Sequence, residues 1–154
     1  MADALTPSDH AAAIAASRDR LQAFAAACPD DVWRAAPLSD QGDRRTVGVI
    51  VDHVADSCDY IGAWMRAIVA GEEPAVSPEL VDQFNAAHEA DRAGVTQADA
   101  VAHLQRSGDA VIALIASLTD SDLDLADGRV GRFAQILARH PDNHRAEIEA
   151  ALRR

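Results

Sequence analysis

Apolar side chains recur every three to four residues in four long stretches of this chain, and segments with proline, glycine or several charges separate these stretches. A helix turns about 100° per residue, so this spacing gathers the apolar side chains on one face. The stretches cover residues 8–27, 46–70, 96–118 and 129–152, and a shorter one covers residues 78–92. We therefore predict an all-α protein with four long amphipathic helices and one short extra helix.

Length and composition limit how such helices can pack. Among the 154 residues, 49% are hydrophobic and only 4% are aromatic. The core must then consist mainly of Ala, Leu, Ile and Val, which allows helices to approach closely. A chain of this length suffices for one domain with its own core. We predict that residues 1–154 form a single four-helix-bundle domain.

The net charge of −11 argues against several kinds of partner. Nucleic acids and anionic membrane surfaces are bound by Lys and Arg, so we expect neither as a partner. No window holds about 18 consecutive apolar residues, and the N-terminus lacks the basic and apolar regions of a signal peptide. Cys28 and Cys58 have no CxxC spacing, and as reduced thiols they indicate a cytoplasmic protein.

Helix ends can be placed from capping residues. The expected N-caps are Ser8, Thr46, Ser77 and Thr96. Gly71 is expected to end the second long helix, because glycine adopts the left-handed conformation found after a helix. Residues 30–45 and 119–128 are expected to be loops, since they combine charges with proline or glycine.

Two histidines lie within the apolar face of the last stretch. His140 and His144 are one helical turn apart, and Glu147 lies beside them. The apolar residues of that face are Phe133, Ile136, Leu137, Ile148 and Ala151. Burying an unpaired neutral polar group costs roughly 1–3 kcal/mol, and a divalent metal would satisfy all three side chains. The alternative is a chance pair of core histidines.

Pro141 directly follows the first of these histidines. It lacks a backbone donor and disfavours helical geometry at His140. Either the helix is kinked here, which keeps His140 and His144 about one turn apart, or it ends and a new helix begins at Pro141.

A third histidine, His53, lies along one edge of the apolar face of the second stretch. Ser57, Tyr60 and Trp64 follow it along the same edge, which concentrates polar and aromatic groups next to a core. These four side chains could form part of a pocket. The alternatives are a boundary histidine bonded to a carbonyl group, and ordinary packing for the other three.

The remaining histidines have no partner at helical spacing. We expect His10 and His103 to be solvated, and His88 to lie at the surface or beside the site. His53, His140 and His144 are thus the histidines that two core-facing helices could bring to one ion. Three neutral imidazoles with one open position are typical of catalytic zinc, although imidazole also suits nickel and iron.

Two short motifs carry a resemblance to a known family. The segment TVGVIVDHVADS over residues 46–57 resembles the first-histidine helix of the DinB-like (YfiT-like) metalloproteins, and HPDNHRAEI over residues 140–148 resembles their closing HxxxH helix. The resemblance implies an up-down-down-up four-helix bundle, often dimeric. It also implies that His53, His140 and His144 bind zinc or nickel.

The same resemblance suggests an activity. Characterised relatives are transferases and isomerases that use bacillithiol, mycothiol or glutathione, including the N-terminal bundle of mycothiol-dependent maleylpyruvate isomerases. We therefore expect a homodimer with a divalent metal, a small electrophilic substrate and a low-molecular-weight thiol as cosubstrate. The alternatives are a metal-dependent hydrolase and a non-catalytic bundle that binds a metal or small molecule.

Further roles at this site are expected for four side chains. Glu147 could orient a ligand histidine through its second nitrogen or act as a base. Ser57, Tyr60 and Trp64 could line the substrate pocket.

Overall fold

The computed structural model describes residues 4–154, and within them every regular element is a helix and none is a strand. The prediction of an all-α protein is therefore confirmed. The elements in chain order are α1 (Pro7–Ala27), α2 (Asp30–Trp33), the short 3₁₀ helix η1 (Ser39–Gln41), α3 (Val47–Val69), α4 (Pro78–Asp91), α5 (Gln97–Ala116), α6 (Asp120–Leu123) and α7 (Leu125–Leu152).

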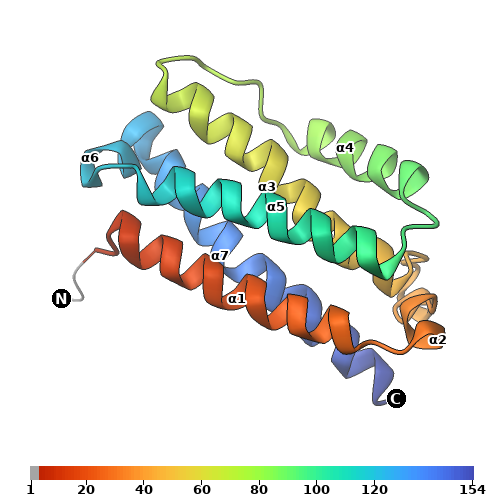
Figure 1. Ribbon diagram of the computed structural model, residues 1–154. Helices are drawn as coiled ribbons and strands as arrows, with labels where there is room; N and C mark the ends of the chain where they lie inside the picture. The colour runs from red at the N-terminus through yellow and green to blue at the C-terminus, as the bar shows by residue number, and fades with distance from the viewer. Residues whose placement is uncertain (1–3) are drawn as a thin grey trace.

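The four long helices lie side by side (Figure 1). Helices α1 and α7 run in one direction and α3 and α5 in the other. Both α1 and α3 pack against α5 and α7, while α4 packs on α3. The largest fully buried side chains include Ile14, Leu21, Ile50, Met65, Leu104, Ile115, Leu137 and Ile148. The core is thus aliphatic, as the composition requires.

Most predicted N-caps are correct, and one is displaced. The hydroxyls of Thr46, Ser77 and Thr96 each accept a backbone N–H of the first turn. Helix α1 begins earlier than expected, because Thr6 and not Ser8 is its N-cap. The Thr6 hydroxyl accepts the Asp9 N–H, and the Asp9 carboxylate accepts the Thr6 N–H. This reciprocal pair satisfies two donors at once, which a cap at Ser8 would not.

The two predicted loops contain short helices. Residues 30–45 hold α2 and η1, and residues 119–128 hold α6 and the start of α7. Helix α2 is anchored by Trp33, a buried side chain whose Nε1–H donates to the Val95 carbonyl. Helix α6 begins with a capping box between Thr119 and Asp122. These local hydrogen bonds form helical turns in segments whose composition resembles a loop.

Helix α7 continues through Pro141. Non-helical dihedral angles within it are confined to residues 126–128, where φ is 52°, 55° and 74°. The regular part therefore begins at Arg129, as predicted. Since no break occurs at Pro141, His140 and His144 stay one turn apart on one face. Ile136, expected on the buried face, is 48% exposed because it lies at the outer edge of the stripe.

None of the helices within residues 4–154 is long and apolar enough to cross a membrane.

Candidate metal centre

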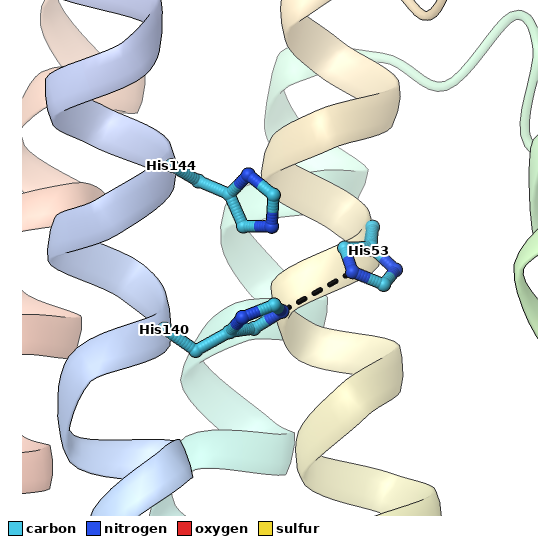
Figure 2. A group of neighbouring side chains, drawn as sticks. All are labelled: His53, His140 and His144. Carbon is cyan, nitrogen blue, oxygen red and sulfur yellow. Dashed lines mark hydrogen bonds between the residues drawn. The ribbon is translucent and has the colours of Figure 1, made fainter. Parts of the chain in front are cut away.

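Three imidazoles from two helices converge at the seam between α3 and α7 (Figure 2). His53 comes from α3, and His140 and His144 come from α7. One nitrogen from each ring lies within 4.8 Å of the other two, and this group could hold a metal ion. The Nε2 atoms of His53 and His140 are 3.1 Å apart. A helix break at Pro141 would have prevented this convergence.

The environment keeps these imidazoles neutral. Burial, together with the charges of the other two imidazoles, lowers the pKa of His53 to about 2. Burial and the His144 charge lower the pKa of His140 to about 4. Burial and the Arg45 guanidinium lower the pKa of His144 to about 4. At neutral pH each ring therefore has a free lone pair to offer a metal.

Two of the ring nitrogens lack a partner. The Nδ1 atoms of His53 and His144 are buried without a hydrogen bond from any described residue. The Glu147 carboxylate comes within 3.2 Å of the His144 Nδ1 atom, but their alignment does not make a hydrogen bond. The Nε2 atoms of His53 and His140 instead face each other across 3.1 Å, and neutral imidazole nitrogens gathered in this way suit a divalent ion. The residues present therefore fit a metal.

The comparison with protein families agrees with this geometry. A model of the DinB superfamily matches residues 13–148, a span that contains all three histidines. The chain belongs to the DinB superfamily. No curated protein and no solved structure matches it. Family membership and the histidine group together fit a metal-binding protein of this superfamily.

The other candidate residues of this DinB-superfamily chain lie at different distances from the triad. The Ser57 hydroxyl donates to the His53 carbonyl at 2.9 Å, and it lies 3.3 Å from His140 Nε2 and 3.2 Å from the Tyr60 hydroxyl. The Trp64 ring is tilted against that of Tyr60, with ring centroids 5.0 Å apart. Glu147, at 56% side-chain exposure, borders the group from its solvent side. Of Ser57, Tyr60 and Trp64, Ser57 is thus the one within hydrogen-bond distance of a triad imidazole.

A second cluster, centred on Asp52, was not predicted. The Asp52 side chain is fully buried, and its oxygens accept hydrogen bonds from His88 Nε2 at 2.8 Å, Arg92 Nε at 2.8 Å and His103 Nδ1 at 2.9 Å. His103 Nε2 also reaches Asp59 at 2.9 Å. We call Asp52, His88, Arg92 and His103 the Asp52 network. It links α3 to α4 and α5.

This network tests the expectations for two histidines. Of the two positions expected for His88, the structure shows the one beside the site, because the residue is only 8% exposed and its ring centroid lies 5.9 Å from that of His53. His103, expected to be solvated, bridges two carboxylates instead, and hydrogen bonds to Asp52 and Asp59 raise its pKa to about 9. The signal that could have revealed them is Asp52 itself, a charge inside the apolar run of residues 47–55.

The remaining histidine and the two cysteines lie apart from these clusters. His10, expected to be solvated, is only 3% exposed, and burial lowers its pKa. Cys28 and Cys58 are free thiols and both are buried. Burial raises the pKa of Cys28, and burial with the Asp59 charge raises that of Cys58 to about 12.

Proposed function

We propose that this protein binds a divalent metal ion through His53, His140 and His144 and uses it in thiol-dependent transfer or isomerisation of a small electrophile. The observation that carries the proposal is the convergence of three neutral imidazoles from α3 and α7, one buried and two half-buried. A zinc or nickel ion held by imidazoles supplies a Lewis acid that keeps a bound thiol deprotonated near neutral pH.

The side chains around the triad have separate tasks in this proposal. Glu147, whose carboxylate lies 3.2 Å from His144 Nδ1, would orient that ring through a small shift that closes the hydrogen bond. The Ser57 hydroxyl gives its proton to the His53 carbonyl, so at His140 Nε2 it can only accept, and it would lose this contact if that nitrogen bound a metal. Tyr60 and Trp64 form an aromatic wall against which the electrophile packs.

The same proposal extends to the assembly. The directions and contacts of the long helices support an up-down-down-up four-helix bundle. We infer a homodimer, as the family resemblance implies, and Ile136 on α7, which is 48% exposed, is an apolar side chain that a second copy would cover. A cytoplasmic location fits the two reduced thiols.

The first test is elemental analysis of the purified, untagged protein beside the His53→Ala variant. We expect near-stoichiometric zinc or nickel in the parent and none in the variant. The matched control is His10→Ala, which removes a buried histidine outside the triad and should keep the metal. Metal in neither protein after incubation with zinc and with nickel would overturn the proposal.

The second test concerns the chemistry. The metal-loaded protein is mixed with monochlorobimane and, in turn, glutathione, bacillithiol or mycothiol. We expect one thiol to be consumed faster than with the His53→Ala variant. Loss of the electrophile at the same rate without any thiol would instead identify a hydrolase.

A further inference from the structure

A cavity of about 590 Å³ lies between α3, α4 and α5, beside the metal centre. Its size is typical of a site for a small molecule. Two of its lining side chains reach the triad. His88 stands against His53, and the Tyr60 hydroxyl contacts Ser57, which in turn contacts His140. The His88 ring and the Tyr60–Ser57 pair therefore separate a molecule in this cavity from the triad imidazoles.

The charges around the cavity do not cancel. Its lining holds the four carboxylates of Asp52, Asp56, Asp59 and Asp91. Against them stand Arg92, Arg106 and His103, whose raised pKa of about 9 keeps it protonated at neutral pH. Counted without the His88 imidazole, which also lines the cavity, these carboxylates outnumber these cations by one.

The excess can be assigned to particular side chains. Asp52 is satisfied by three donors, and Asp59 is paired with His103. Asp56 and Asp91, by contrast, form no ion pair with any residue that the structure describes, and neither does the Arg106 guanidinium, so two such carboxylates stand against one such cation. Burial raises the pKa of Asp56, and the Asp59 charge adds to this shift. A cation beside Asp56 would remove that penalty.

Two further features of the lining suit a protonated amine. His88 is 6% exposed and is held by Asp52 at Nε2, so its Nδ1 atom remains a second hydrogen-bonding position without a partner in residues 4–154. The rings of Tyr60 and Phe84 stand 5.4 Å apart and both line the cavity. Aromatic faces attract organic cations and also cover their hydrocarbon part.

We propose that this cavity binds a small primary amine in its ammonium form, with the nitrogen at Asp56 and the hydrocarbon part against Tyr60 and Phe84. Binding itself depends only on the cavity. The role of this amine as a substrate or cosubstrate of the triad rests on the function proposed above. The uncompensated charge excludes carboxylate ligands from the same position.

The test is an NMR titration of the isotope-labelled protein with benzylamine, benzyl alcohol and benzoate, three probes of similar size and different charge. We expect benzylamine alone to give saturable amide shifts, and these should be centred on α3, α4 and α5 near the cavity. Saturable binding of benzoate at this place, or equal binding of benzyl alcohol, would overturn the proposal, as would no saturable shift with benzylamine at tens of millimolar.

A pair of variants locates the cation. Asp56→Asn should weaken benzylamine binding roughly tenfold, the loss expected for one charge-assisted contact. Asp82→Asn, which removes an exposed carboxylate of α4 outside the cavity lining, should leave binding unchanged. Equal affinity in Asp56→Asn and the parent would contradict the assignment.

Failure of this inference can be distinguished from failure of the proposed function. The Asp56→Asn variant should keep its metal, and His144→Ala should lose metal but keep benzylamine binding. Amine binding in a protein that takes up no metal would support the cavity and reject the metal centre. Metal uptake without any selectivity for benzylamine would support the metal centre and reject the amine site in the cavity.

Discussion

Two clusters of histidines lie on different sides of α3, and the neighbouring residues Asp52 and His53 belong to one cluster each. His53 belongs to the triad with His140 and His144, whereas Asp52 collects His88 and His103. Both clusters are largely buried, yet their pKa values move apart, to about 2 for His53 and about 9 for His103. The difference is the presence of a buried carboxylate.

One helix can thus hold two kinds of histidine site. Successive residues on a helix point about 100° apart, so His53 faces α7 while Asp52 faces α4 and α5. Imidazoles buried without an acid remain neutral and can offer lone pairs to a metal. Imidazoles around a buried carboxylate donate hydrogen bonds to it, and these bonds link neighbouring helices.

The largest expected effect comes from removing the central carboxylate. Asp52→Asn leaves Arg92 and His103 without their buried counter-charge and should lower the free energy of unfolding by about 3 kcal/mol. Urea denaturation at neutral pH measures this. Asp82→Asn, an exposed control on α4, should change stability by less than about 0.5 kcal/mol. A loss no greater than that of the control would show that the Asp52 network contributes no stability.

Metal binding at the triad should raise the stability of the protein, whereas removal of one triad imidazole should leave the fold intact. His144→Ala should keep the helical circular dichroism of the parent, because the packed faces of the long helices remain. Zinc at about 100 times its dissociation constant should stabilise the parent by about 2.7 kcal/mol and leave the variant unchanged. Thermal or chemical unfolding with and without zinc tests this. An unfolded variant would show that the site is structural.

The two clusters should also differ in their response to pH. In the metal-free protein, His140 and His144 have folded pKa values of about 4, below the unfolded value of 6.5, so their stabilisation is present above pH 6.5 and is lost as pH falls. His103 has a folded pKa of about 9, above its unfolded value of 6.5, so its contribution is present below pH 6.5 and is lost as pH rises through 9.

Chemical denaturation of the metal-free protein across this pH range measures both the loss of stability at acid pH and the loss at alkaline pH. The His103→Gln variant should lose part of the alkaline decline and retain the acid one. A variant with an unchanged alkaline decline would mean that His103 is not held protonated by Asp52 and Asp59.

The smallest effect is expected at the edge of the triad. Ser57→Ala removes a hydroxyl that bonds the His53 carbonyl and contacts His140, so stability should fall by about 1 kcal/mol. Metal stoichiometry should stay the same, because the imidazoles are unaltered. Elemental analysis and urea denaturation measure the two quantities. Loss of metal in this variant would place Ser57 among the groups that the metal needs.

The sequence alone was enough to predict those features of the fold that repeat at helical spacing. The apolar stripes predicted the long helices, and the side-chain caps at Thr46, Ser77 and Thr96 were correctly placed. The convergence of His53 with His140 and His144 followed from their positions on core-facing stripes.

Contacts between distant helices were not predictable in the same way. His88 and His103 lie 36 and 51 residues from Asp52 and share no periodic pattern with it. Their burial depends on how α4 and α5 are rotated against α3, which spacing within one helix does not determine. His10 was misjudged for the same reason. The short helices α2 and α6 were missed because single hydrogen-bonded turns form them.

The buried cysteines make the protein resistant to the reagents that a thiol-transfer assay requires. With both thiol pKa values raised and both side chains covered, neither sulfur forms much thiolate at neutral pH. We therefore expect alkylating electrophiles to label Cys28 and Cys58 only slowly. In the thiol-dependent transfer proposed above, the sulfur would come from the added thiol and not from a cysteine of the chain.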